Sequence, residues 1–536
     1  MTRINPRNHL KIANSTALLL ALAGACTGTM LSACSDDSDS PLTPGAAGHA
    51  SAGQSGSGTA GKPNAGSAGR AAENAGAAGV GGSSDEDASA GASGEAGSPA
   101  WDLHLSSSAT PKTFDISAGG NDRFYGVTFD ADDDIYAVGV TSSGFDATAD
   151  YATVIAKFTP DGSLDPSFGD NGYVIRNVAV GLAGELARGI ALQSNGKIIV
   201  SESVEHPGAA DARDRDIALL RFNPDGTKDT GFGVDGVKLI DLSDGVLVGS
   251  SYLADSAWGL AVDADDRIVV SGGLVAASKT DTDFALLRLT KDGELDQTFA
   301  TNGVFTLDTQ IADPPVSNNA SPRNLTLLPG NRGIIAAGYQ PVPGADTKPV
   351  VYRVTNAGKL DKTFGVDGVF SEQVLPEQTE TYAAVPQTDG SLVTVGYGRE
   401  LSTETTDIVS LRIKPDGTRD QSYGSAGLVR IDVAGFADNA RKLVVLPNDH
   451  LVLVGGGRAT SADVDGIVVA LTADGQPDLA FSDTGFKTFD LGGPADFLWG
   501  VALSPSRTRL VAVGIKGVTA NSSNDDAALL VMKLVP

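Results

Sequence analysis

One position near the start of each recurring segment in this chain carries an arginine or an aromatic residue in all copies but one. In chain order the position holds Tyr125, Arg188, Trp258, Arg323, Ala383, Arg441 and Trp499. Guanidinium groups pair with anions, and aromatic rings stack on sugars, peptides and cations. If these side chains share one surface, they can bind a glycan or an anionic peptide. The alternative is that they pack between neighbouring elements, as long amphipathic side chains often do.

An acidic residue stands three residues before this position in nearly every copy. The residues are Asp122, Glu185, Asp255, Ala320, Glu380, Asp438 and Asp496. Carboxylates are the ligands that Ca²⁺ prefers. A carboxylate that recurs in each repeat is more typical of a group that caps a turn. We therefore predict no metal and no cofactor, and keep Ca²⁺ as the less favoured alternative.

Residues typical of catalytic sites are sparse. Beyond residue 100 the histidines are His104, His206 and His450, in unrelated sequence contexts, so no multi-histidine metal site or histidine-based triad is expected. No glycine-rich phosphate loop or serine nucleophile motif stands out, and we assign no catalytic residue. The two cysteines, Cys26 and Cys34, precede the repeats, which excludes disulfides and thiolate chemistry there.

A turn motif recurs six times and first appears as "FTPDGSLDPSFGDNGYV", from Phe158. Its first glycines are Gly162, Gly226, Gly293, Gly358, Gly417 and Gly475. An aspartate follows three residues later, Phe or Tyr three residues after that, and a closing glycine ten residues after the first. This constant spacing indicates a fixed tight turn, with glycine supplying a positive φ.

Four short β-patterned runs accompany each turn, as in "WGLAV", "RIVVSGG", "DFALLRL" and "GVFTLDT". Four strands per repeat are typical of a propeller blade. The first three runs occur seven times and the fourth six times. Lys112 to Ile116 can supply the missing fourth strand by pairing with a strand that includes Leu529 to Leu534. The sequence predicts an all-β, seven-bladed β-propeller of four-stranded antiparallel blades, closed by its two termini.

The strand "DFALLRL" followed by "DGELDQTF" resembles the delta-60 repeat family of exported bacterial proteins. The likeness covers roughly residues 111 to 536. The copies depart from the pattern at Ala300, at Asn356 and Ala357, and at Ala470, which replaces the Arg or Lys of the third strand. The resemblance implies no particular activity and no catalytic residues.

The N-terminus has the features of an export signal: a basic start, the apolar run "STALLLALAGA" and the sequence "LSAC". Leu31 to Cys34 resembles the lipobox of bacterial lipoproteins, which implies lipidation of Cys34 and a membrane anchor, with outer-membrane sorting in a Gram-negative envelope. Gly, Ala and Ser dominate the segment that follows. We predict a signal peptide over 1–33, the lipidated cysteine and a disordered tether over 34–110, and the propeller over 111–536.

These features favour a monomeric, non-catalytic binding module on the cell envelope. The longer, more variable loops fall on one face of the predicted propeller, where function is usually located, and we expect the ligand there. Its candidate binding residues are Tyr125, Arg188, Trp258, Arg323, Arg441 and Trp499. A formal net charge of −27 excludes nucleic acid as an expected partner. A propeller hydrolase or lactonase with a site built from several blades, and a structural spacer, are the alternatives.

Replacing Cys34 with alanine should release the protein from membranes, because lipidation needs that thiol. Membrane fractionation of cells that express the variant measures this. A Cys34→Ala protein that stays in the membrane fraction would contradict the lipobox interpretation.

Overall fold

The computed structural model describes residues 104–142, 150–179, 184–206, 214–248, 251–277, 281–309, 320–342, 345–460, 463–517 and 524–535. All of them belong to the compact unit that contains Asp39–Pro536. The predicted signal peptide, Cys34 and most of the predicted tether lie outside the described residues. Among the residues described, no helix has the length and apolar character needed to cross a membrane.

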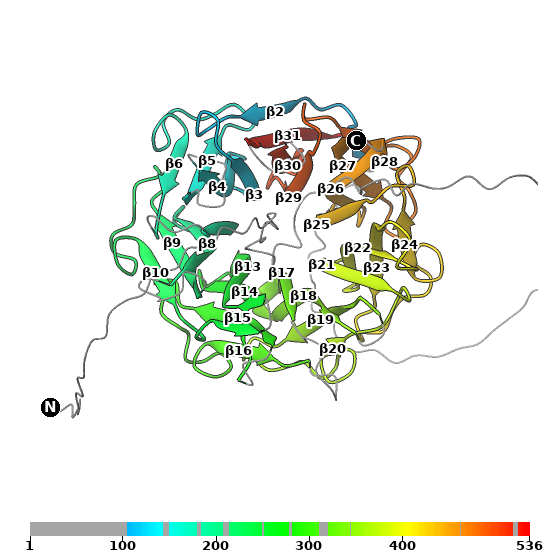
Figure 1. Ribbon diagram of the computed structural model, residues 1–536, viewed down its shortest axis with the longest axis horizontal. Helices are drawn as coiled ribbons and strands as arrows, with labels where there is room; N and C mark the ends of the chain where they lie inside the picture. The colour runs from blue at the N-terminus through cyan, green and yellow to red at the C-terminus, as the bar shows by residue number, and fades with distance from the viewer. Residues whose placement is uncertain are drawn as a thin grey trace, which may run out of the picture. The chain divides into compact units, whose positions relative to one another are not determined.

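The described residues form antiparallel sheets of four main strands, as predicted, with one short 3-10 helix, η1 (Pro329–Asn331). Figure 1 shows the sheets arranged around a common centre, with the first strand of each sheet innermost. One sheet contains β3 (Asp122–Phe129), β4 (Ile135–Ser142), β5 (Tyr151–Phe158) and β6 (Tyr173–Arg176). The next contains β7 (Leu186–Leu192), β8 (Ile198–Glu205), β9 (Arg215–Phe222) and β10 (Val237–Ile240). A third contains β13 (Ser256–Val262), β14 (Ile268–Val275), β15 (Thr282–Leu289) and β16 (Val304–Leu307).

Two further groups of four strands are joined by a single parallel pair, Thr347 with Gln378. They contain β17 (Ser321–Leu328), β18 (Gly333–Pro341), β19 (Thr347–Val354) and β20 (Val369–Phe370), and then β21 (Gln378–Pro386), β22 (Leu392–Arg399), β23 (Asp407–Ile413) and β24 (Leu428–Ile431). The next sheet contains β25 (Asn439–Val445), β26 (Leu451–Thr460), β27 (Asp463–Leu471) and β28 (Phe486–Phe489). A separate hairpin pairs β11 (Val246–Val248) with β12 (Ser251–Leu253) in the connection between β10 and β13.

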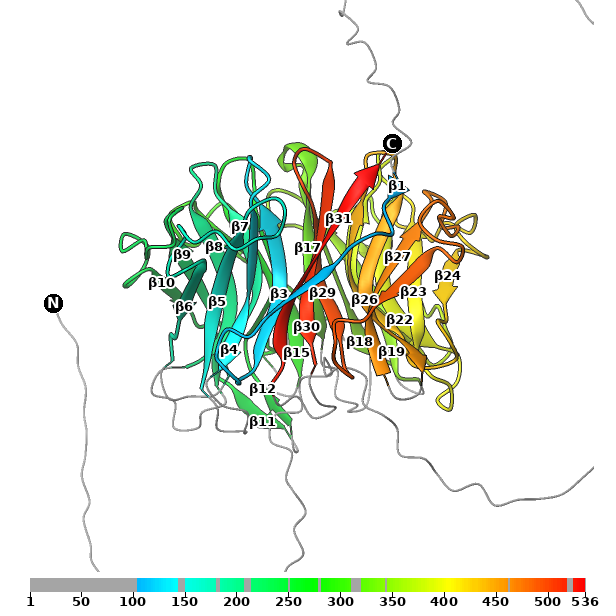
Figure 2. The ribbon, with the colours of Figure 1, turned by 90° about the horizontal axis from the view of Figure 1, so that it is seen from above.

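The last sheet contains strands from both ends of the described chain. It is built from β29 (Phe497–Leu503), β30 (Arg509–Lys516) and β31 (Asp526–Val535), with β1 (His104–Leu105) and β2 (Pro111–Phe114). β2 pairs antiparallel with β31 from Pro111–Leu530 to Phe114–Ala527. β1 pairs with the far end of the same strand, in a segment that the sequence analysis assigns to the tether. Figure 2 shows both N-terminal strands running along β31.

The hydrophobic core lies between neighbouring sheets. Val138 and Ile155 of one sheet pack with Val200 and Leu220 of the next, and the same pattern is repeated along the chain. Between the last sheet and the first, Leu529 of β31 belongs to the same buried cluster as Phe124 of β3, with Phe114 of β2 packed against it. The two faces of a sheet are therefore both covered, as the near-continuous apolar third strands require.

The turn motif recurs because it performs several packing tasks together. In the third copy Arg288 donates to Asp296, with Nε to Oδ2 at 2.8 Å, and its guanidinium lies over the ring of the buried Phe299. Gly293 has a φ of 85° and leaves no room for a side chain against Phe232 of the preceding turn. Backbone hydrogen bonds join the first turn to the second, the third to the fourth, the fourth to the fifth and the fifth to the sixth.

Deleting residues 111 to 118 should lower the melting temperature by several degrees. The deletion removes β2, the packing of Phe114, and the Ile116 and Ser117 N–H groups that donate to the buried Asp122. The expected loss is on the order of 3 kcal/mol, the scale of losing one large core side chain. Thermal unfolding measures it, with Thr113→Ala, at an exposed position of β2, as the control that changes little. An unchanged melting curve for the deletion would show that β2 does not support the sheet.

Candidate functional site

A β-bulge in each innermost strand positions the candidate side chains. Bulges insert one extra residue and change the direction of its side chain. The register shifts lie between Phe124 and Gly126, Ala187 and Gly189, Ala257 and Gly259, Pro322 and Leu325, Thr381 and Ala383, Ala440 and Lys442, and Leu498 and Gly500. The residues inside them include all six predicted site residues: Tyr125, Arg188, Trp258, Arg323, Arg441 and Trp499.

In the fifth copy, the assignment of Ala383 to this position is wrong. The bulge falls on Tyr382, one residue earlier, so the recurring position holds an arginine or an aromatic residue in every copy. In most copies a glycine follows this position and marks it in the sequence, but β21 has no glycine there. Aligning "TYAAV" from Thr381 with "AWGLA" from Ala257 would have identified Tyr382, because Ala383 then takes the glycine's place.

Arginine and aromatic side chains from successive sheets contact one another. The guanidinium carbon of Arg188 lies 3.7 Å from the ring centre of Trp258, and that of Arg323 lies 3.8 Å from the same ring. Arg323 and Arg441 both lie over Tyr382, at 4.7 and 4.1 Å. Cation–π contacts of this kind stabilise both partners when they are shielded from water.

The same contacts continue to the last and first sheets. Arg441 lies 5.3 Å from the ring centre of Trp499, which meets the ring of Tyr125 edge to face at 5.3 Å. We call Tyr125, Arg188, Trp258, Arg323, Tyr382, Arg441 and Trp499 the bulge cluster.

Exposure divides the cluster into two groups. Arg323 and Arg441 are buried, with 4% and 3% of their surface exposed, and Tyr382 is buried with them. Tyr125, Arg188, Trp258 and Trp499 are half-buried. The two buried arginines thus act first as supports for the aromatic rings, and the half-buried residues are those that a ligand can reach.

The buried carboxylate of Glu380, which the sequence pattern groups with the turn-capping acids, lies near the two buried arginines. Glu380 accepts hydrogen bonds from Gln378 Nε2 at 2.8 Å and from Tyr382 Oη at 3.3 Å. Burial raises the pKa of Glu380, and hydrogen bonds and the charges of Arg323 and Arg441 only partly oppose the shift. Its neighbours supply hydrogen-bond donors and positive charge to a carboxylate that is shielded from water.

Two tyrosines from second strands complete this buried region. Tyr339 and Tyr397 pack with Tyr382, and Arg323 Nη2 donates to Tyr339 Oη at 2.6 Å. Burial raises the pKa of Tyr397 well above its ordinary value. A tyrosine with a raised pKa stays protonated and serves as a hydrogen-bond donor and packing surface.

A lysine directly follows the bulge in β25. Its Nζ donates to Asn324 Oδ1 of β17, which is a contact between sheets two copies apart in the sequence. Burial lowers the pKa of Lys442 to about 8. The amine is therefore mostly charged at pH 7 and adds a positive group to the innermost strands.

The recurring acids before the bulge cap the loops that lead into the first strands. Asp255 Oδ2 accepts from the N–H groups of Leu242 and Ser243 at 2.6 and 3.1 Å, and Asp122, Glu185, Asp438 and Asp496 make corresponding contacts. In the fifth copy Thr379 takes this place and accepts from Leu375 N–H at 3.0 Å. The one-residue correction at Tyr382 therefore also explains why Glu380 is free of the capping role.

Two histidines that are far apart in the sequence lie close together, contrary to expectation. The ring centres of His104 and His450 are 6.0 Å apart, beside Asp478. Local sequence contained no signal for this contact, because it depends on the pairing of β1 with the last strand.

The raised pKa values of the capping carboxylates lead us to expect that folding stability depends on pH. Burial raises the pKa of Asp255, Asp438 and Asp496 from 3.8 to about 7. Between these values the folded state binds more protons than the unfolded state, so the free energy of unfolding should fall as pH rises from 5 to 8. Urea denaturation at several pH values measures this slope.

Asp255→Asn should flatten that slope. Asp225→Asn is the matched control, because hydrogen bonds from Thr227 lower the pKa of this exposed turn residue and it does not titrate in this range. A wild-type stability that increases between pH 5 and 8 would contradict the assignment.

Comparison with known proteins supports the fold. Residues 131–168, 209–232 and 264–299 match the family model described as "Domain of unknown function (DUF5122) beta-propeller". No curated protein matches the chain. The delta-60 repeat assignment stays a prediction.

Solved structures of low identity resemble the chain over most of their length. Polysaccharide lyase Uly1 is 8% identical, with a TM-score of 0.45, over 78% of this chain and 90% of that one. The NanB sialidase of Streptococcus pneumoniae is 9% identical, with a TM-score of 0.40, over 80% and 93%. The alpha-L-arabinofuranosidase Arb93A of Fusarium graminearum is 11% identical, with a TM-score of 0.38, over 64% and 91%. The family-model match and the repeated four-stranded sheets together identify this chain as a β-propeller protein.

Proposed function

We propose that this chain is an exported lipoprotein whose β-propeller is a non-catalytic module that binds an acidic ligand, either a glycan or an anionic peptide, at the bulge cluster. The observation that carries the proposal is the gathering of Arg188, Arg323, Arg441 and Lys442 on the innermost strands of a chain with net charge −27. A basic site on an acidic protein attracts anions locally while the rest of the surface repels them.

Partial exposure of the cluster supports ligand access. Arg188 and the rings of Trp258, Trp499 and Tyr125 are half-buried. They lie near the beginning of each first strand, at the end that receives the loops from the preceding sheet. Arg188 supplies a guanidinium group for an acidic substituent, and the edges of the aromatic rings supply apolar contact.

The proposal includes a ring of seven blades closed by the two termini. The eight-stranded sheet divides into two four-stranded blades at its single parallel pair, and the remaining main sheets supply the other five. The pairing of β2 with β31 and the buried cluster shared by the last and first sheets support the closure. A closed ring has no exposed sheet edge at the joint, which fixes the distances between bulge residues.

The proposal also places the protein in the cell envelope. Lipidation at Cys34 would anchor a monomer in the outer membrane, and the segment between Cys34 and the propeller would let the module reach ligands away from the lipid surface. The predicted lipobox in the sequence is what supports this part of the proposal.

Glycan and peptide arrays probed with residues 104–536 should select acidic ligands. Arg188→Ala should weaken binding about tenfold, and the double variant Trp258→Ala/Trp499→Ala should weaken it more, because each charge pair or aromatic contact contributes about 1 to 2 kcal/mol. Arg332→Ala removes one charge at an exposed hairpin and is the matched control, with unchanged affinity expected.

Three outcomes would redirect the proposal. Binding that survives the double tryptophan change would place the site elsewhere on the propeller. Turnover of a bound ligand would favour the hydrolase alternative. A lack of binding to every acidic ligand, with a folded protein, would favour the structural spacer.

A further inference from the structure

The aspartate of the turn motif has a cationic partner from the third strand in five of the six turns. The partners are Lys157 with Asp165, Arg221 with Asp229, Arg288 with Asp296, Arg353 with Asp361 and Arg412 with Asp420, at 2.6 to 3.3 Å. Each pair neutralises a carboxylate that is mostly shielded from water. The aspartate of any turn that lacks the third-strand cation needs another partner.

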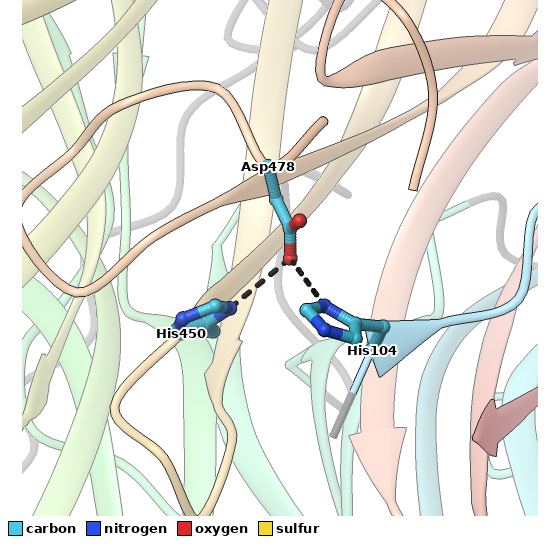
Figure 3. A group of neighbouring side chains, drawn as sticks. All are labelled: His104, His450 and Asp478. Atoms are coloured by element: carbon cyan, nitrogen blue, oxygen red, sulfur yellow. Dashed lines mark hydrogen bonds and ion pairs between the residues drawn. The ribbon is translucent and has the colours of Figure 1, made fainter. Parts of the chain in front are cut away.

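The sixth turn is the exception. Its third strand has Ala470 where the other copies have Arg or Lys, and the aspartate of this turn is Asp478. Two histidines approach the same carboxylate oxygen instead (Figure 3): His450 Nδ1 lies 3.0 Å and His104 Nδ1 3.5 Å from Asp478 Oδ2. His450 comes from the turn before β26, and His104 from β1 beside the last strand.

These three side chains form a known type of metal-ligand set. Two imidazoles and one carboxylate are common ligands of Zn²⁺, with bonds of about 2.0 to 2.1 Å. Ligand atoms at the corners of a tetrahedron of that size are about 3.3 to 3.4 Å apart. The two nitrogen–oxygen distances lie close to this value, and all three candidate ligand atoms lie within 4.8 Å of one another.

The surroundings also suit a bound ion. Asp478 is 6% exposed, whereas His104 and His450 are 23% and 18% exposed, so the carboxylate is fixed in the protein and the imidazoles reach solvent. Ala480 N–H donates to Asp478 Oδ1 at 3.0 Å, which orients the carboxylate and leaves Oδ2 toward the histidines. Hydrogen bonds from the protein to the atoms of a ligand that do not bind the metal hold the ligand in position.

We propose that His104, His450 and Asp478 bind a Zn²⁺ ion, with water completing the coordination. The ion replaces the positive charge that this copy of the motif has lost at Ala470. It also joins two sheets, because His104 belongs to the sheet of β31 and the other two ligands to the sheet of β25–β28. Lys487 Nζ already donates to Ser107 O at 2.6 Å beside this junction. The proposal is independent of the ligand at the bulge cluster.

Zn²⁺ titration of the chelator-treated protein by calorimetry tests the site. Wild-type protein should bind one ion at this site, and its melting temperature should rise with Zn²⁺ concentration. His104→Ala, His450→Ala and Asp478→Asn should each lower the affinity at least about tenfold, the lower limit for the loss of even a supporting group at a metal site. His206→Ala is the matched control, since His206 lies beside Asp216 and Asp241 in a separate group and its loss should leave the affinity unchanged.

Circular dichroism of each variant shows whether it folds, and Asp478→Asn keeps the oxygen that accepts from Ala480 if the alanine variants are unstable. Co²⁺ in place of Zn²⁺ should give the visible absorption of a tetrahedral site in wild-type protein and lose it in Asp478→Asn. Absence of Zn²⁺ binding in wild-type protein, or affinity that falls only in His206→Ala, would overturn the proposal and leave a histidine–aspartate hydrogen-bond group.

Discussion

The bulge in each first strand is the constraint on which the candidate site depends. A regular strand sends alternate side chains to its two faces, where the neighbouring sheets cover them. The extra residue breaks this alternation, so a large polar or aromatic side chain leaves the apolar interface between sheets. Trp258 and Arg323 then meet side chains from other sheets, so the candidate site is built from several sheets together.

Burial of positive charge follows from that arrangement and has to be compensated. Arg323 and Arg441 are buried, and a buried charge is tolerated only where partners replace its hydration. The ring of Tyr382 lies against both guanidinium groups, and the buried Glu380 carboxyl lies close enough for both positive charges to oppose the rise in its pKa. These contacts fix the aromatic rings in place, so the binding proposed at this site would cost little side-chain entropy.

Local patterns in the sequence predicted the four-stranded antiparallel sheets, the turn motif and the pairing of an N-terminal strand with the last one. They misplaced the fifth bulge residue, because Tyr382 is followed by Ala383 where most copies have glycine, and they consequently gave Glu380 a capping role that Thr379 fills. The approach of His104 to His450 depends on a strand pairing between the chain ends, and no local spacing encodes it. Which candidate side chains are buried also depends on contacts between sheets.

The most direct test of the proposed binding measures the fluorescence of Trp258, which lies in the candidate site. In the variant Trp101→Phe/Trp499→Phe, the emission of Trp258 is recorded while a uronic-acid oligosaccharide or a glutamate-rich peptide is added. The account predicts a saturable change in emission with the better of the two ligands, at the concentrations where calorimetry detects binding, and loss of that change with Arg188→Ala. Binding detected by calorimetry without any change in Trp258 emission, and unaffected by Arg188→Ala, would contradict it.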